Sequence, residues 1–307
     1  PLIMKDFISI NDINNDQLES LLEIASDYRR GVYNDKPLSG ESIALIFEKP
    51  SLRTFVSFDV GIYEMGGHPI YLKGEDIGLD VREPVEDVAR VLERWCSVIV
   101  ARVFSHRTLT RLAAISKKPV INALSDLEHP CQALADLLTI KQHKKKLGGI
   151  VVAYIGDANN VARSLSLACS AVGAHFKIAS PSGYGFSQEW VDLVNSRYQG
   201  SGLELESFRD PISAVSDADI VYTDVWTSMG HENERRDRIQ AFEGYQVNPD
   251  LLSKAKPDVL LMHDMPAHYG EEIPEGMLDD PRSIAFDQAE NRLHAQKAIL
   301  RHLALNR

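Results

Sequence analysis

Short apolar runs alternate with amphipathic stretches along most of this 307-residue chain. IALIF at 43–47, SVIVARV at 97–103 and PVINAL at 119–124 have the length and residue types of buried strands. The pattern continues in the second half, where VVAYIGD at 151–157 and HFKIAS at 175–180 are two of the predicted strands. Stretches with helical spacing lie between these runs. Such alternation predicts an α/β fold in which mostly parallel sheets are covered by helices on both faces.

The length of the chain and the restart of the pattern predict two domains. A long helical stretch at 129–149 ends in KKKLGG, and a new series of strands and helices follows it. We expect domains at 1–140 and 141–287, each a mostly parallel sheet flanked by helices, with a last helix at 288–307 packing back on the first domain. Ligands bind at the carboxyl ends of parallel strands, so the active site is expected in a cleft between the two domains.

Three segments carry more specific expectations. Residues 7–31 are expected to begin as a strand and continue as a helix capped by Asn15 or Asp16. LELES at 203–207 is expected to be a short strand. The segment at 228–245 is polar and poor in core residues, and we expect it to move as a lid that excludes water.

Composition limits the classes of partner. The net charge of −11 disfavours a nucleic acid or an anionic membrane surface as partner. No apolar run reaches the roughly 18 residues of a membrane span, and the first residues lack the pattern of a signal peptide, so a cytoplasmic protein is expected. The three cysteines are far apart and are expected to be reduced thiols, two of them buried. Neither a metal nor a cofactor is expected.

The stretch EKPSLRTFVSF at 48–58 turns polar directly after a predicted strand. One interpretation is a plain strand-to-helix turn in which Ser51 is the N-cap and Pro50 blocks an earlier start. The other is an anion site, because unpaired N–H groups at a helix start would be joined by the hydroxyls of Ser51 and Thr54 and the guanidinium of Arg53. This stretch alone leaves the two interpretations equal.

Polar groups also follow five other predicted strands. Taken alone, each group can be explained without a function. Arg102 can be a surface arginine, His129-Pro130 a helix start, and the other groups a packed strand end or a turn with a capping aspartate. The turn at 156–160 lacks the GxGxxG glycines of a dinucleotide site. The groups are Arg102 with His106, SDLEHPCQ at 125–132, GDANN at 156–160, DVWTSMG at 224–230 and HDMP at 263–266.

Taken together and in this order, the motifs resemble those of the aspartate/ornithine carbamoyltransferase family, over nearly the whole chain. The SMG that follows DVW is specific, since it separates the ornithine branch from the aspartate branch. The matching motifs are Ser51-Leu52-Arg53-Thr54, Arg102, His129-Pro130-Cys131-Gln132, Gly156-Asp157-Ala158-Asn159-Asn160, Asp224 to Gly230, His263-Asp264-Met265-Pro266 and Glu290-Asn291-Arg292.

The resemblance implies transfer of the carbamoyl group from carbamoyl phosphate to the distal amine of L-ornithine, giving L-citrulline and phosphate. It assigns the phosphate to the SLRT turn, with Arg102 bridging the phosphate and the carbamoyl oxygen. His129 would donate to that oxygen, and Gln132 would hold the carbamoyl NH₂. The implied donor site is Ser51, Leu52 through its backbone, Arg53, Thr54, Arg102, His129, Gln132, Met265 and Arg292.

The resemblance also implies an amino-acid site for ornithine. Asn160, Ser228 and the backbone of Met229 would hold the α-groups, and Asp224 the amines. The attacking amine must lose a proton, and the departing phosphate is the expected final base. The resemblance also implies a cis peptide at Met265-Pro266 and a homotrimer, or a multiple of it. It implies that the reaction belongs to arginine biosynthesis or to the arginine deiminase pathway.

Four positions depart from the family pattern. Leu52 stands where threonine is usual, Phe55 where arginine is frequent, and Gly78 where a glutamine or histidine commonly reaches a neighbouring subunit. Asp264 replaces a cysteine near the distal amine, and a second carboxylate beside Asp224 would favour the protonated amine. We hypothesise that Asp264 helps to bind and deprotonate the attacking amine.

Three alternatives stay open. Asp264 suits a carbamoyltransferase for another amine such as putrescine, although the SMG motif and Asn160 suit an α-amino acid. A nucleotide-binding oxidoreductase is disfavoured by the missing glycines. A non-catalytic paralogue would not explain why the chain has Arg53, Arg102, His129 and Gln132 together.

Overall fold

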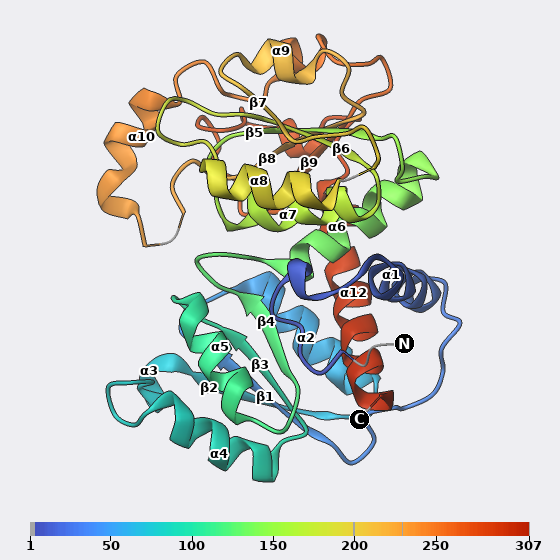
Figure 1. Ribbon diagram of the computed structural model, residues 1–307, viewed down its shortest axis with the longest axis vertical. Coiled ribbons are helices and arrows are strands. Elements are labelled where there is room, and N and C mark those ends of the chain that lie inside the picture. The colour runs from blue at the N-terminus through green and yellow to red at the C-terminus, as the bar shows by residue number, and fades with distance from the viewer. Residues whose placement is uncertain (1–3, 199, 229, 307) are drawn as a thin grey trace. The chain divides into compact units, whose positions relative to one another are not determined.

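The computed structural model describes residues 4–198, 200–228 and 230–306. The chain divides into two compact units, the first made of residues 1–138 and 290–307 and the second of residues 139–289. Each unit contains one parallel sheet covered by helices, so the expected α/β class is confirmed (Figure 1). Within the described residues, no helix is long and apolar enough to cross a membrane.

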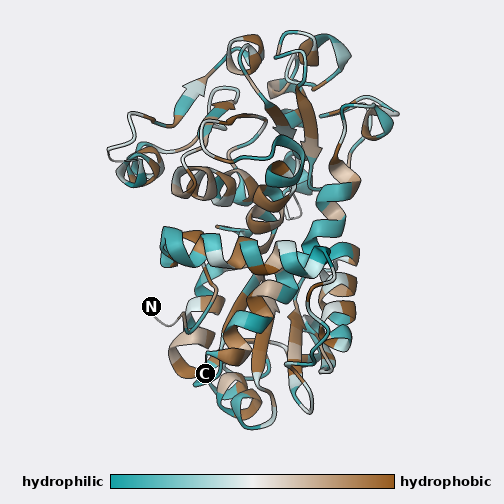
Figure 2. Cartoon of the chain, turned by 90° about the vertical axis from the view of Figure 1, so that its right-hand side faces the viewer, coloured by the Kyte–Doolittle hydropathy of each residue, from teal (hydrophilic) through white to brown (hydrophobic). Residues whose placement is uncertain are grey.

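The first unit is built on a four-stranded parallel sheet with the order β2-β1-β3-β4. Its central strands are apolar and fully or almost fully buried along most of their length, which explains why these runs contain hardly any polar residue. Figure 2 shows the strands mainly in the hydrophobic colour, whereas the helices carry both colours. The strands are β1 (Ser42–Phe47), β2 (His68–Lys73), β3 (Val98–Arg102) and β4 (Val120–Leu124).

Helices cover both faces of this sheet (Figure 1). One layer holds α4 (Val85–Trp95) and α5 (His106–Ile115), which pack on each other. The other layer holds α2 (Leu52–Glu64), against which α12 (Ala285–Leu305) packs closely near Gly61. The remaining elements are η1 (Ile10–Asp12), α1 (Asn15–Arg29), α3 (Gly74–Ile77) and α6 (Pro130–Lys144), which begins in this unit.

The second unit repeats the plan with a five-stranded parallel sheet in the order β7-β6-β5-β8-β9. Helices α7 and α8 lie on one face, and α9 packs on the other (Figure 1). The strands are β5 (Val151–Ile155), β6 (His175–Ala179), β7 (Glu206–Phe208), β8 (Ile220–Thr223) and β9 (Leu260–His263). The other elements are α7 (Asn160–Ala171), α8 (Gln188–Arg197), α9 (Pro211–Val215), η2 (Glu232–Glu234), α10 (Arg235–Ala241), α11 (Pro249–Leu252) and η3 (Met277–Asp279).

Two local expectations were wrong, and the bounds of a third were shifted. The strand expected from residue 7 is a single bridge between Phe7 and Ile121, followed by the 3₁₀ turn η1. The cap of α1 is Asn14 rather than Asn15 or Asp16, and it forms a reciprocal capping box with Gln17. The short strand expected at 203–207 is present as β7, but it covers Glu206–Phe208, because its pairing with β6 begins only at Glu206.

The three cysteines are free and all are buried, one more than expected. Burial raises the pKa of the Cys131 thiol to about 12, so this side chain stays protonated at neutral pH. It donates a hydrogen bond to the carbonyl oxygen of Asn122, which fixes the first turn of α6 against β4.

Candidate functional site

The start of α2 presents hydroxyl and N–H groups directly after β1. Ser51 is the N-cap, and its Oγ accepts from the Thr54 N–H at 3.2 Å. Leu52, the first helical residue, is 72% exposed, so the usual threonine is replaced here by a side chain that makes little contact within the unit. Unpaired backbone N–H groups and the helix dipole favour an anion at such a helix start.

Two guanidinium groups converge on the hydroxyl of Thr54. Arg292 donates to its Oγ1 from Nη2 at 3.0 Å, and Arg102 donates from Nη1 at 3.5 Å. Arg102 ends β3, Arg292 comes from α12, and all three side chains are buried. In a chain with a net charge of −11, this is a strong local concentration of positive charge next to a helix start. The geometry suits a ligand with two negative charges.

Gln132 is tied to the same group. Its Oε1 accepts from Arg292 Nη1 at 2.6 Å, and its Nε2 donates to Asp136 Oδ1 at 2.8 Å. These contacts fix the orientation of the amide, with the oxygen toward Arg292. The oxygen expected to hold a carbamoyl NH₂ thus already accepts one hydrogen bond, which leaves it one further lone pair.

His129 precedes α6 and is 3% exposed. Burial lowers the pKa of its imidazole well below the usual 6.5, and the positive charges of Arg292 and Arg102 lower it further. The imidazole is therefore neutral at pH 7. A neutral ring has one N–H, with which it can donate to a carbonyl oxygen without giving up a proton.

In the second unit, the start of α7 is linked to the end of β8. Asn159 caps α7 by accepting from the N–H groups of Val161 and Ala162, and its Nδ2 donates to Asp224 Oδ2 at 2.7 Å. Asp224 is 7% exposed. Asn159 therefore positions Asp224, a role that its place in the GDANN motif did not predict. The signal in the sequence was an asparagine at the expected start of a helix, just after a predicted strand, where an N-cap is common.

The other predicted amino-acid-binding residues lie on the same two loops of this unit. Asn160 is the first residue of α7, next to the cap, and its side-chain oxygen accepts from the Val161 N–H at 3.0 Å. Ser228 follows β8, is half-buried, and accepts through its carbonyl from the His231 N–H. Met229 lies outside the described residues.

Residues 230–245 are anchored at two points despite their polar sequence. Arg238 is buried and forms an ion pair with Asp157 at 2.7 Å, and its guanidinium also donates to the Trp226 carbonyl at 3.0 Å. Phe242 is fully buried and stacks on Trp226. Burial raises the pKa of Asp157, although the Arg238 charge opposes this shift. Among the described residues of this segment only Arg238 and Phe242 are buried, so the expectation that it is poor in core residues is confirmed.

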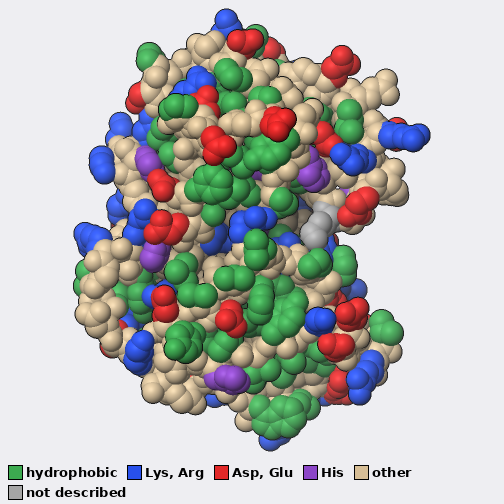
Figure 3. Space-filling model, turned by 180° about the vertical axis from the view of Figure 1, so that it is seen from behind, with side chains coloured by type: hydrophobic (Ala, Val, Ile, Leu, Met, Phe, Trp, Pro, Cys, Tyr) green, Lys and Arg blue, Asp and Glu red, His purple; other side chains and the backbone are tan. Residues whose placement is uncertain are grey.

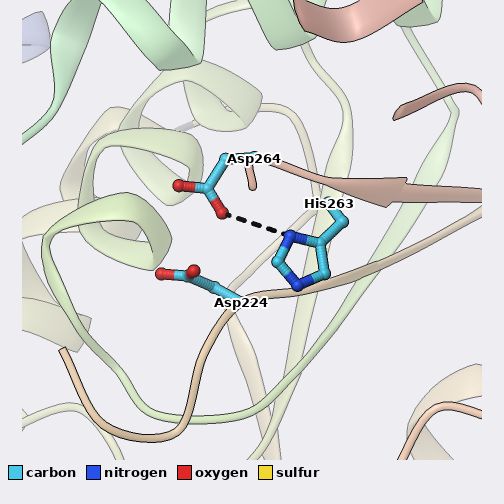
Figure 4. Close-up of side chains that lie close together, drawn as sticks. All are labelled: Asp224, His263 and Asp264. Atoms are coloured by element: carbon cyan, nitrogen blue, oxygen red, sulfur yellow. Dashed lines mark ion pairs between the residues drawn. The ribbon is translucent and has the colours of Figure 1, made fainter. Parts of the chain in front are cut away.

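Asp224, His263 and Asp264 face one another at the ends of β8 and β9 (Figure 4). Each offers a ligand-type atom within 4.8 Å of the others, and His263 Nδ1 lies 3.8 Å from Asp264 Oδ1. Both ring nitrogens are already used, however, since Nδ1 accepts from the Met265 N–H and Nε2 donates to Glu272. In this conformation the imidazole has no lone pair left for a metal ion.

Two further expectations concern the backbone. The expected cis peptide at Met265-Pro266 is confirmed. Gly78 ends α3 with a φ of 62°, and a Cβ there would lie 2.9 Å from Cβ of Arg82. Glycine at this position therefore makes a tight left-handed turn that a glutamine or histidine would strain.

The first unit thus brings together Ser51, Thr54, Arg102, Gln132 and Arg292 by direct contacts, with His129 in the field of both arginines. The second unit joins Asp224 to the α7 start and places it beside Asp264. The binding roles of these residues stay predictions.

Comparisons with known proteins cover both units. Residues 5–142 match the family described as "Aspartate/ornithine carbamoyltransferase, carbamoyl-P binding domain", and residues 148–303 match the corresponding "Asp/Orn binding domain". An ornithine carbamoyltransferase of Thermococcus kodakarensis is 45% identical over 96% of this chain and 95% of its own length. A relative in Pyrococcus furiosus, named as the anabolic enzyme, is 44% identical over the same shares.

Solved structures agree with these matches. The ornithine carbamoyltransferase from Pyrococcus furiosus superposes with a TM-score of 0.93 over 97% of this chain and 96% of that one. The anabolic enzyme from Campylobacter jejuni is 38% identical and superposes with a TM-score of 0.94 over 99% and 100% of the two chains. With both family domains matched in order and relatives this similar over almost its full length, the chain belongs to the aspartate/ornithine carbamoyltransferase family.

Proposed function

We propose that this protein is an ornithine carbamoyltransferase, which transfers the carbamoyl group of carbamoyl phosphate to the distal amine of L-ornithine. The observation that carries the proposal is the Thr54 hydroxyl shared by Arg102 and Arg292 at the start of α2. Carbamoyl phosphate is a dianion with a neutral carbamoyl end, and this group supplies cations, hydroxyls and N–H groups in one place. The names of the relatives support ornithine as the acceptor.

The donor is held as follows. Ser51, Arg53, Thr54 and the N–H of Leu52 bind the phosphate, and Arg102 spans the phosphate and the carbamoyl oxygen. The neutral ring of His129 donates to that oxygen. Because negative charge grows on the oxygen as the tetrahedral intermediate forms, donors placed there in advance lower the barrier.

Gln132 and Arg292 complete the donor site. Arg292 holds the Gln132 amide by its oxygen, so the remaining lone pair of that oxygen is fixed for the carbamoyl NH₂. Met265 contributes to the carbamoyl end of the site. Catalysis in this scheme is mainly positioning and electrostatic stabilisation.

The acceptor is held by the second unit. Asn160, Ser228 and the backbone of Met229 bind the α-carboxylate and α-ammonium, while Asp224 and Asp264 bind the amines. The distal ammonium first loses one proton, with Asp264 as the proposed acceptor. Its nitrogen lone pair then forms the bond to the carbamoyl carbon, the carbon–oxygen bond to phosphate breaks, and the departing phosphate takes the second proton.

We extend the proposal to location, direction and assembly. A cytoplasmic enzyme acting toward citrulline in arginine biosynthesis fits the negative charge and the anabolic relative. Large hydrophobic side chains are exposed in an apolar stripe along α2, and a homotrimer would cover them. Figure 3 shows hydrophobic side chains grouped on one face of the first unit. The stripe consists of Leu52, Val56, Val60 and Tyr63. Light scattering should give three times the chain mass, and a monomer would contradict this part.

The assay for the function offers carbamoyl phosphate with L-ornithine, putrescine, N-acetylornithine and L-aspartate in separate reactions. Phosphate release and the carbamoylated amine are both measured. We expect citrulline and phosphate in equal amounts with L-ornithine. Turnover with putrescine alone would replace the proposal by its diamine alternative, and no turnover with any amine would support a non-catalytic paralogue.

A further inference from the structure

A buried histidine–glutamate pair lies next to Asp224 and Asp264, the two carboxylates of the proposed amine subsite. The side chains of His263, at the end of β9, and Glu272 are both fully buried. His263 Nε2 donates to Glu272 Oε1 at 2.8 Å. A hydrogen bond to a buried carboxylate is stronger than one between neutral groups and fixes the plane of the ring.

The contacts of this pair close a clamp around residues 264–267. The Met265 N–H donates to His263 Nδ1 at 2.8 Å, so Nδ1 carries the lone pair and Nε2 carries the proton. At the other end, the His268 N–H donates to the same Glu272 Oε1, also at 2.8 Å. The backbone of the segment is thus held at both ends by one carboxylate, directly at His268 and through the imidazole at Met265.

The clamped segment is under backbone strain. Met265 has a φ of 55°, in the left-handed region that side chains other than glycine rarely adopt. Such a conformation persists only where its surroundings hold it. The backbone N–H of His263 donates to Gln288 Oε1 at 3.0 Å, so the clamp is itself anchored in the unit.

Asp264 lies within the clamped segment, and its carboxylate faces Asp224 (Figure 4). We propose that Glu272 is a positioning residue for the amine acceptor: through His263 it holds the strained 264–265 backbone and thereby the place of Asp264 beside Asp224. This inference rests on the proposed function. Its influence falls on the acceptor, because Glu272, His263 and Asp264 all belong to the unit that contains Asp224.

Two substitutions separate the hydrogen bonds from the charge. In Glu272→Gln, the amide oxygen can accept from both the His263 Nε2–H and the His268 N–H, so the clamp is kept. Glu272→Ala removes it. Glu272 Oε2 has no hydrogen-bond partner among the described residues, so the new NH₂ of glutamine would lack an acceptor and the rescue should be incomplete.

The kinetic test compares the two Michaelis constants. For Glu272→Ala we expect the KM for ornithine to rise at least about tenfold, while the KM for carbamoyl phosphate changes less than about twofold. Glu272→Gln should return the ornithine KM to within about threefold of the wild type. The matched control is Glu206→Ala, which breaks the histidine–glutamate pair formed with His175 at 2.7 Å on β6 and β7, and which should change neither constant.

Hydrogen exchange gives a readout that does not depend on activity. The amides of Met265 and His268 should exchange faster in Glu272→Ala and almost as slowly as in the wild type in Glu272→Gln. Equal changes of both Michaelis constants, exchange unaffected by Glu272→Ala, or Glu272→Gln behaving like Glu272→Ala would each overturn the proposal. A wild-type protein that makes no citrulline would instead refute the proposed function, and the exchange test would still decide on the clamp.

Discussion

Replacing Arg292 by methionine tests the donor site at the residue that links most of its parts. The guanidinium donates to Gln132 Oε1 at 2.6 Å, to Thr54 Oγ1 at 3.0 Å, and to Gln296 Oε1 at 3.2 and 3.3 Å. Its side chain is 2% exposed, so water cannot take over these contacts. Methionine fills similar space but offers no donor.

The expected magnitude follows from these contacts. A hydrogen bond to a charged group contributes about 1.5–3 kcal/mol, and the two shortest bonds dominate. Since methionine also removes the cost of burying a charge, we expect the free energy of unfolding to fall by about 2–4 kcal/mol. Losing the charge-assisted hydrogen bonds that orient Gln132 and Thr54 in the donor site should lower kcat/KM for carbamoyl phosphate by about 10- to 150-fold.

Urea unfolding and initial rates at varied carbamoyl phosphate measure both effects. Arg301→Met is the matched control, because Arg301 lies on the same helix and pairs with the half-exposed Asp35 at 2.7 Å. Pairs of this kind contribute about 1 kcal/mol or less, so the control should keep its kinetics. Unchanged kcat/KM in Arg292→Met, or the same loss in both variants, would refute the reasoning.

Three further predictions concern charge and pH. The folded pKa of His129 lies below its unfolded value of 6.5, so the unfolded state binds more protons in acid. The free energy of unfolding should therefore fall below pH 6.5 by up to about 1.4 kcal/mol per pH unit. Unfolding titrations of His129→Gln should show a flatter slope. Arg238→Leu should lower the free energy of unfolding by about 3–5 kcal/mol at neutral pH, because it leaves the Asp157 carboxylate buried without its partner. The loss should be smaller in acid, where Asp157 can be protonated. Calorimetry at both pH values checks this, and an equal loss of stability at both would contradict it. Asp264→Asn should lower the rate with ornithine at least about tenfold and change its pH profile, and an unaltered profile and rate would dispose of the proton-acceptor role.

Much of the fold was predictable because its signals are local. A strand buried on both faces must be apolar, as β1 and β3 are, and a helix start after a strand needs a cap such as Ser51. Errors arose where two signals compete. Asn14, Asn15 and Asp16 can all cap a helix, and the choice of Asn14 depends on the reciprocal contact with Gln17. At 203–207 the pattern suited a strand, but the pairing partner β6 begins the ladder only at Glu206.

The site was predictable only in its outline. Motif order and resemblance pointed to the residues at the strand ends, whereas their supporting contacts join segments far apart in sequence. Asn159 holds Asp224 across 65 positions, and Arg292 reaches Thr54 across 238. Glu272 resembles a surface residue in the sequence EEIPEG, and only its complete burial against His263 indicates a role. Hydropathy patterns contain no information about such long-range partners.

A crystal structure of the protein with a phosphonate analogue of carbamoyl phosphate is the most direct test of the central claim. We predict phosphonate oxygens within about 3.2 Å of Ser51 Oγ, Thr54 and the guanidinium groups of Arg53 and Arg102, with the carbonyl oxygen facing His129. An analogue bound elsewhere, with these side chains making no contact to it, would contradict the account.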